Sequence, residues 1–149
     1  MNVKGKGGID YTLSAKLIKS GGEGEIYDIN GKPGIVAKIY KPGKATSEKE
    51  RKLIKMVVFP PDASVLSQIA WPQDVLYENG LFVGFIMPKM NINEDLNVIY
   101  EYGASAKYPR MTWANKITIA QNLCAVLHSI HESGHVCGDL NPKTSALTQ

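Results

Sequence analysis

The chain has 149 residues, of which 44% are hydrophobic and 21% charged, and these are proportions of a globular protein rather than of a disordered one. Its net charge of +3 is small and spread along the sequence, which argues against a nucleic-acid-binding protein. Two cysteines are too few for a disulfide framework, and no apolar run reaches the ~20 residues of a membrane helix. We therefore expect a cytoplasmic protein without a membrane partner.

The first part of the sequence predicts three strands. Residues 1–8 are rich in glycine and lysine, and we expect them to be frayed. From Tyr11 to Leu17 apolar and polar residues alternate, which predicts a half-buried strand. A second strand is predicted at about Glu25 to Ile29, and a turn over residues 30–34 leads to a third strand from Ile35 to Tyr40.

Two features of these strands indicate a nucleoside-triphosphate site. The turn between the first two strands contains Gly21, Gly22 and Gly24, and backbone without Cβ atoms can lie close to a phosphate and offer it N–H groups. Lys38 lies within the apolar third strand, where a buried cation is costly without an anionic partner. Each feature has an ordinary alternative, namely a hairpin turn and a lysine whose amine reaches the surface.

A helix is predicted from Thr46 to Val58, with acidic residues in its first turn, and Pro60 prevents its continuation. Glu50 shares a helix face with Ile54 and Val57. Because these apolar residues are expected to point inward, Glu50 can meet Lys38. Glu48 is the second candidate for this pairing. Solvent exposure is the alternative for both, because glutamates early in a helix interact favourably with its dipole in any case.

The remaining strand signal is a hairpin, Asp74–Tyr77 and Leu81–Met87, around a Glu-Asn-Gly turn. Residues 91–110 are rich in turn formers. The longest helix signal follows, from Thr112 to Ser133, and ends at Gly134. This helix carries one apolar stripe, made of Ile117, Ala120, Leu123, Leu127 and Ile130.

The segment after the long helix reads His-Val-Cys-Gly-Asp-Leu-Asn-Pro-Lys-Thr over residues 135–144. Asp139 is a candidate general base, and a loop aspartate that caps a turn is the alternative. His128, His131, His135 and Cys137 suggest a metal site, because the first two lie three residues apart on the helix and Cys137 could join them. The better explanation is that these side chains stand at a helix end and in a loop without sharing a metal, because no paired cysteine motif accompanies them.

Taken together, the glycine-rich turn, the strand lysine and an Asp-Leu-x-Pro segment about a hundred residues later resemble the protein kinase superfamily. The family motif G-x-G-x-x-G-x-V places its second and third glycines on Gly21 and Gly24 and its valine on Ile26, while Lys19 occupies the first glycine position. The resemblance covers about Tyr11 to Thr144.

The resemblance implies an α+β fold. It predicts a kinase-like small lobe over residues 1–90, with an antiparallel five-stranded sheet and one helix, and then the first helices of an incomplete helical large lobe over residues 91–149. It also implies ATP as ligand, with Met87 as gatekeeper, the carbonyl of Pro88 and the N–H of Met90 facing adenine. The implied ATP-binding residues are Gly21, Gly22, Gly24, Ile26, Val36, Lys38, Met87, Pro88 and Met90.

By the same resemblance, Asp139 accepts the proton of the substrate hydroxyl, and Lys38 binds the phosphates and pairs with Glu50. Gly138 stands where the family has arginine, as in its atypical branches. Thr144 replaces the metal-binding asparagine, and a hydroxyl is a poorer Mg²⁺ ligand than an amide oxygen. The D-F-G segment does not occur in this sequence, so we expect weak Mg²⁺ binding and little catalysis from this chain alone.

Two functions are consistent with these residues. The first is an ATP-binding kinase-like domain, which in the family transfers phosphate to a serine or threonine hydroxyl of a protein. The second is a catalytically inactive kinase-like module, in which a second copy or a partner protein covers the apolar stripe, because the later helices that bury it in kinases do not occur in this sequence. An unrelated α+β binding domain is a third alternative.

Overall fold

The computed structural model describes residues 1–91, 94–101, 104–138 and 146–147. The chain forms two compact units. The first consists of Met1–Pro60 and Ile69–Lys89, and the second of Pro61–Gln68 and Met90–Gln149.

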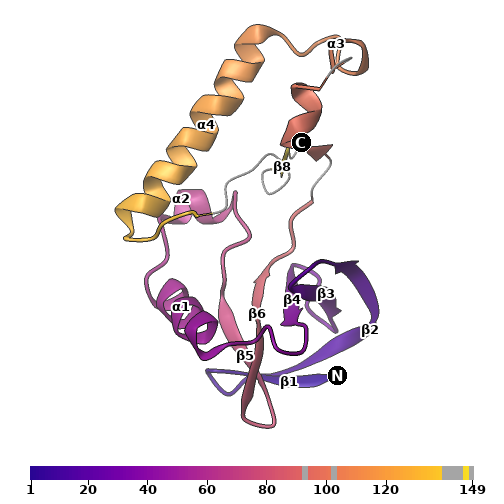
Figure 1. The fold of residues 1–149 in the computed structure, drawn as a ribbon, viewed down its shortest axis with the longest axis vertical. Helices are drawn as coiled ribbons and strands as arrows, with labels where there is room; N and C mark the ends of the chain where they lie inside the picture. Colours follow the sequence, from indigo (N-terminus) through magenta and orange to yellow (C-terminus); the bar gives the residue numbers. More distant parts are fainter. Residues whose placement is uncertain (92–93, 102–103, 139–145, 148–149) are drawn as a thin grey trace. The chain divides into compact units, whose positions relative to one another are not determined.

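The first unit is built on a closed barrel of antiparallel strands (Figure 1). Its strands are β1 (Asn2–Gly5), β2 (Asp10–Ser20), β3 (Gly24–Ile29), β4 (Ile35–Tyr40), β5 (Asp74–Glu78) and β6 (Leu81–Pro88). They follow one another around the barrel in the order β1-β2-β3-β4-β6-β5, and β5 pairs with β1 to close it.

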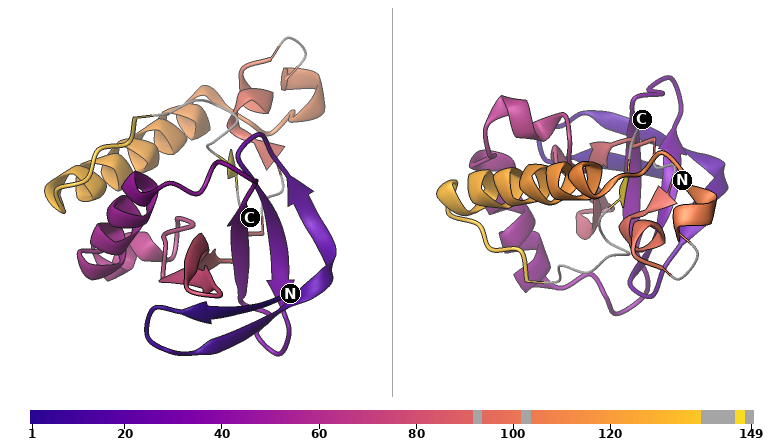
Figure 2. Two further views of the ribbon diagram at one scale, coloured as in Figure 1. Left: turned by 60° about the horizontal axis from the view of Figure 1, so that its bottom comes forward. Right: turned by 90° about the horizontal axis from the view of Figure 1, so that it is seen from above.

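The expected five-stranded sheet with one helix is therefore wrong, and the reason lies in β1. Lys4 is opposite Asp10 of β2 and also opposite Tyr77 of β5, so both edges of β1 are paired. The N-terminal segment is not frayed, because Val3 is only 3% exposed. Its glycine content concealed a strand in which Gly5 leaves the space that the Asp74 carboxylate occupies. Figure 2 (left) shows β1 and β2 curving together in indigo and violet.

The barrel interior is apolar, as alternation along the strands predicts. Its buried residues are Val3, Tyr11, Leu13, Ile29, Ala37, Leu76 and Ile86. The predicted strands at residues 25–29 and 35–40 are confirmed. The alternation fails in the second half of β2, where Leu17 and Ile18 are exposed. The pairing of β2 with β3 shifts register on either side of Leu17, and such bulges turn side chains away from their expected face.

Helix α1 (Ser47–Val58) packs against β5 and β6 on the outside of the barrel. The hydroxyl of Thr46 caps it by accepting a hydrogen bond from the N–H of Lys49. A second apolar cluster lies between the helix and the strands, with Leu53, Val75 and Phe85 buried at its centre. The barrel therefore has an interior face and, under α1, a covered outer face.

The second unit is mainly helical. It contains α2 (Ala63–Leu66), the short strand β7 (Glu94–Asp95), η1 (Leu96–Ile99), α3 (Ala104–Lys107), α4 (Trp113–Glu132) and β8 (Ala146–Leu147), which pairs with β7.

The long helix predicted from Thr112 to Ser133 is confirmed by α4. Thr112 and Asn115 form a reciprocal cap at its start, and Gly134 follows its end with a φ of 78°. No helix among the described residues is both long and apolar enough to cross a membrane.

Candidate functional site

Four of the residues predicted to bind ATP lie on the outer face of the barrel. Lys38 in β4 is directly opposite Ile26 in β3 and Phe85 in β6. Val36, two residues before Lys38, is opposite Met87. Directly opposed residues of an antiparallel pair point to the same side, as do residues two apart on one strand. Ile26, Val36, Lys38 and Met87 therefore share one face with Phe85, which belongs to the cluster under α1.

The glycine-rich turn lies at one end of this face, because Gly24 begins β3 opposite Tyr40 of β4. The N–H of Gly21 donates to the carbonyl of Gly24 over 2.9 Å, and this bond closes the turn. Within the described part of the chain, neither the N–H of Gly22 nor that of Glu23 donates a hydrogen bond. A Cβ on Gly22 would meet nothing within 4 Å. The turn thus has two successive N–H groups without an acceptor in the described residues, and such groups can bind an anion.

Among the three glycines of the turn, Gly24 is the one that close packing requires. A Cβ there would lie 2.6 Å from the carbonyl oxygen of Ile39, whereas a Cβ on Gly21 would make an ordinary contact of 3.7 Å. Gly84 of β6 was not among the predicted site residues, yet a Cβ there would collide with the carbonyl oxygen of Lys38. A glycine inside a predicted strand is the signal that could have identified it. Both neighbours of β4 thus approach the lysine-bearing strand closely.

Lys38 is half-buried, and its amine lies near two adjacent aromatic rings. Its Nζ atom is 5.9 Å from the ring centroid of Tyr40 and 5.9 Å from that of Phe85. In the described residues no carboxylate lies within ion-pair distance of this amine. The rings attract the cation through their electron-rich faces but leave its charge uncompensated. Lys38 can therefore accept an anionic ligand.

Glu50 lies on the inward side of α1, partly buried, while Glu48 is exposed. The structure does not bring Glu50 to Lys38. Instead, the hydroxyl of Tyr77 in β5 donates a 2.6 Å hydrogen bond to Oε1 of Glu50. Burial, followed by this bond and the charge of Glu50, raises the pKa of Tyr77 to about 12.

Two other residues predicted to bind ATP lie at and just after the end of β6. Pro88 ends β6 opposite Ile35, and Met90 belongs to the second unit. Asp139 and Thr144 lie outside the described residues. Side chains of the types that bind metals do not gather in groups of three or more in the part of the chain that the structure describes.

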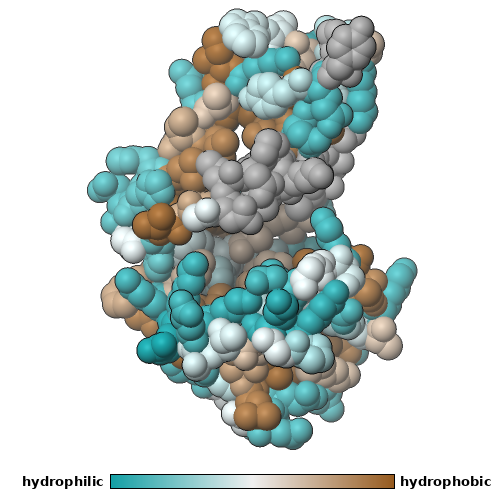
Figure 3. Space-filling view, in the orientation of Figure 1, coloured by the Kyte–Doolittle hydropathy of each residue, from teal (hydrophilic) through white to brown (hydrophobic). Residues whose placement is uncertain are grey.

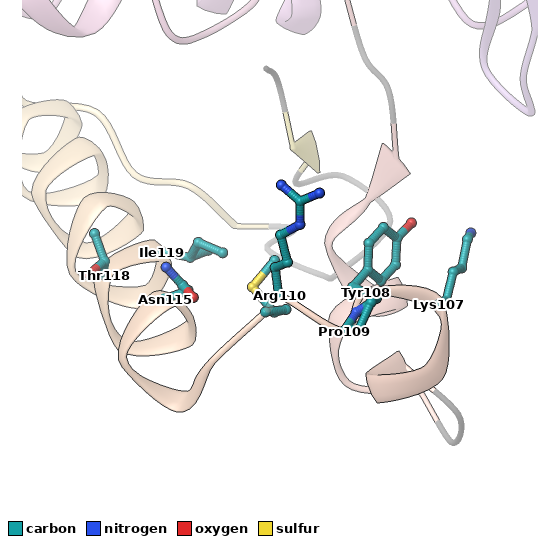
Figure 4. A pocket seen from close by; sticks show the side chains of 8 residues that line it. Lys107, Tyr108, Pro109, Arg110, Asn115, Thr118 and Ile119 are labelled. Atoms are coloured by element: carbon teal, nitrogen blue, oxygen red, sulfur yellow. The ribbon is translucent and has the colours of Figure 1, made fainter.

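A separate hollow of about 650 Å³ lies in the second unit (Figure 4). It is formed by the connection between α3 and α4 and by the first turns of α4, and two of its lining residues, Lys107 and Arg110, are cationic. None of the residues predicted to bind ATP lines it. The candidate site therefore rests on the outer face of the barrel.

The apolar stripe of α4 is covered unevenly. Ile130 is buried and Leu123 and Leu127 are partly buried, but Ile117 is 47% exposed. Trp113, four residues before Ile117, is 74% exposed. Hydrophobic surface is visible along α4 in Figure 3. The first half of this helix therefore presents apolar side chains to solvent.

Comparison with known proteins finds two similar proteins, both named as kinases. No protein-family model matches the sequence. The chain is 35% identical over 124 residues to protein kinase YegI of Escherichia coli O157:H7, an alignment that covers 81% of this chain and 19% of that protein. It is 35% identical over 135 residues to protein kinase YegI of Escherichia coli strain K12, covering 89% of this chain and 20% of that protein. The chain thus spans about a fifth of the length of these relatives. Similarity to kinases over most of the chain supports a kinase-like assignment.

Proposed function

We propose that this chain binds ATP on the outer face of the barrel, with the phosphates between the glycine-rich turn and Lys38. The observation that carries the proposal is that, among the described residues, the N–H groups of Gly22 and Glu23 donate no hydrogen bond and Lys38 on the adjacent strand forms no ion pair. Gly24 is opposite Tyr40, and Lys38 lies two residues along the same strand, or about 7 Å away at the rise of a strand. A polyphosphate chain can span that separation.

The apolar residues of the same face suit the adenine base. Ile26, Val36 and Met87 lie in adjacent cross-strand rows and are half-buried or buried. Ile26 and Met87 are partly exposed and can contact a purine ring, whereas Val36 is 4% exposed and lies beneath them as packing. The resemblance to kinases adds the carbonyl of Pro88 and the N–H of Met90 as hydrogen-bonding partners of the adenine edge.

The reaction we propose is that of protein kinases, in keeping with the names of the relatives. A serine or threonine oxygen of the acceptor protein would attack the γ-phosphorus, the bond to the β–γ bridging oxygen would break, and Asp139 would take the hydroxyl proton. Thr144 would be a weak Mg²⁺ ligand. Because this sequence contains no D-F-G segment, we propose that this chain alone transfers phosphate poorly.

Nucleotide binding is tested by thermal unfolding with and without Mg²⁺-ATP, backed by titration with a fluorescent ATP analogue. We expect ATP to raise the unfolding temperature of the wild-type chain and to leave that of Lys38→Ala unchanged. Lys52→Ala is the matched control, because Lys52 is an exposed lysine on the neighbouring helix α1. No stabilisation of the wild type by millimolar ATP, or equal stabilisation of all three proteins, would contradict the proposal.

We also propose that the exposed part of α4 binds a second copy of the chain or a partner protein. Trp113 and Ile117 lie one turn apart and share a face of the helix, and both are exposed. We expect the wild-type chain to sediment as a dimer at micromolar concentration and Trp113→Ser/Ile117→Gln to sediment as a monomer. Leu81→Gln, which changes an equally exposed apolar residue of the barrel unit, should not alter the assembly. A monomeric wild type would exclude the homodimer.

A further inference from the structure

The glycine-rich turn itself carries a carboxylate, Glu23, whose side chain reaches α1. Its Oε1 atom lies 2.8 Å from Nζ of Lys49 in a hydrogen-bonded ion pair. The carbonyl of Glu23 also accepts a 2.9 Å hydrogen bond from the N–H of Lys41, just beyond β4. The turn is thus tied to β4 through its backbone and to α1 through one side chain.

This carboxylate lies among the cations of the candidate site. The Nζ atoms of Lys49 and Lys38 are 4.8 Å and 5.9 Å from the centroid of the same ring, that of Tyr40. The hydrogen bond and charge of Lys49, and then the charges of Lys38 and Lys44, lower the pKa of Glu23. Glu23 is therefore ionised at neutral pH, and its carboxylate lies near the position proposed above for the phosphates of a nucleotide.

We propose that Glu23 is an internal competitor of the phosphate group and that Lys49 is a second phosphate-binding cation. Without ligand, the Glu23 carboxylate neutralises Lys49 and holds the turn against α1. A polyphosphate displaces the carboxylate, because two anions cannot share this position without strong repulsion, and it then binds Lys49 together with Lys38. The inference rests on the proposed ATP binding and adds to it both a residue and a conformational change.

The solvent exposure of the pair makes this exchange possible. The Lys49 and Glu23 side chains are 29% and 57% exposed, and ion pairs of that kind are weak enough to exchange partners. The ligand class follows from the charge. A triphosphate should gain more from two lysines than a monophosphate does, so ATP should depend on Lys49 and AMP should not.

The inference is tested by measuring ATP affinity by calorimetry on the full 149-residue chain and three variants. Glu23→Gln removes the competitor and should bind ATP about two- to fivefold more tightly than the wild type. Lys49→Ala should bind ATP more weakly by a similar factor and AMP with unchanged affinity. Glu48→Gln is the matched control, because it removes the same charge from an exposed position next to Lys49, and it should bind ATP like the wild type.

The direction in which Glu23→Gln changes the ATP affinity distinguishes two roles of the ion pair. Glu23 either competes with the phosphates or holds the turn in the conformation that binds them. If the ion pair only braces the turn for binding, Glu23→Gln should bind ATP more weakly, and that result would overturn the inference. Equal affinities of Glu23→Gln and Glu48→Gln would overturn it as well, while Lys38-dependent binding by the wild type would still support the proposed function. If none of the proteins binds ATP, the proposed function and this inference both fail.

A second measurement tests, in the absence of nucleotide, whether the Glu23–Lys49 ion pair holds the turn to α1. Hydrogen exchange at the amide of Gly21, which donates to the carbonyl of Gly24, should be faster in Glu23→Gln than in the wild type, because the turn is then no longer held to α1. Glu48→Gln should exchange at the wild-type rate. Equal exchange in all three proteins would show that the ion pair does not hold the turn, and it would overturn the inference.

Discussion

The hydroxyl of Tyr77 in β5 and the carboxylate of Glu50 in α1 are joined by a 2.6 Å hydrogen bond, and this bond fixes the first half of the helix to the barrel. The ring of Tyr77 packs edge-on against Phe82, 6.4 Å between centroids, within the cluster under α1. The glutamate that the kinase resemblance assigns to Lys38 thus has a structural partner of its own.

Removing this hydrogen bond should destabilise the barrel unit. Tyr77→Phe keeps the ring but leaves the partly buried Glu50 carboxylate without its donor, and we expect a loss of about 1–2 kcal/mol in the free energy of unfolding. Urea denaturation followed by fluorescence measures it. Tyr100→Phe, which removes a hydroxyl from an exposed ring, should change stability by less than about 0.5 kcal/mol. Equal effects of the two substitutions would refute a stabilising role for the bond.

The same tyrosine predicts a loss of stability at alkaline pH. Its pKa is about 10 in an unfolded chain and is raised to about 12 in the folded one, so the folded state keeps a proton that the unfolded state releases. The stabilisation is therefore complete below pH 10 and is lost as the pH rises towards 12. Urea midpoints measured across this window should fall less steeply in Tyr77→Phe than in the wild type. The urea midpoint of Tyr77→Phe should still decrease somewhat with pH, because burial also raises the pKa of Tyr40 and Tyr11. Identical slopes would contradict the assignment.

Substituting Gly84 should disturb the strand that carries Lys38. An alanine Cβ there would collide with the carbonyl oxygen of Lys38, and relieving the contact requires β4 and β6 to separate. We expect Gly84→Ala to lower the free energy of unfolding by about 1–3 kcal/mol, as overpacking does in other proteins. Gly22→Ala is the control, because its Cβ would meet nothing within 4 Å, and its stability should stay close to that of the wild type. A Gly84→Ala variant as stable as Gly22→Ala would show that the strands yield easily.

The closing strand of the barrel makes a further prediction. Val3 is almost fully buried in the interior cluster, so Val3→Ala should lower the free energy of unfolding by about 2 kcal/mol through lost contacts and a small cavity. Lys4→Ala, one residue further on, loses only an exposed ion pair to Asp10 at 3.7 Å and should be nearly neutral. Thermal denaturation of both variants provides the comparison. A neutral Val3→Ala would mean that the first strand contributes little to stability.

The sequence located individual elements more reliably than their assembly. The apolar run from Ile35 to Tyr40 after a turn predicted β4 correctly, and the cap at Thr112 marked the start of α4. Closure of the barrel could not be predicted in this way. It depends on two backbone pairings of a four-residue strand whose composition resembles that of a flexible tail, and only long-range packing of Val3 distinguishes the two.

In the candidate site too, local patterns predicted some placements, while those that depend on contacts between distant elements could not be predicted. The alternation of side chains along a strand makes it certain that Val36 and Lys38 share a face, whereas the partner of Glu50 depends on which strand lies under α1. The helical period identified Glu50 as inward-facing, but nothing local identified Tyr77 as its neighbour. Gly84 went unnoticed because its role concerns the backbone of another strand.

Because the strands of the first unit form a ring, each of them pairs with two neighbours. The pairing of β1 with β2 is short, since it spans residues 10–12 of β2 whereas that strand continues to Ser20. The β1 side of the second half of β2 is therefore an edge at which an extended peptide can add a strand, even though the barrel is closed.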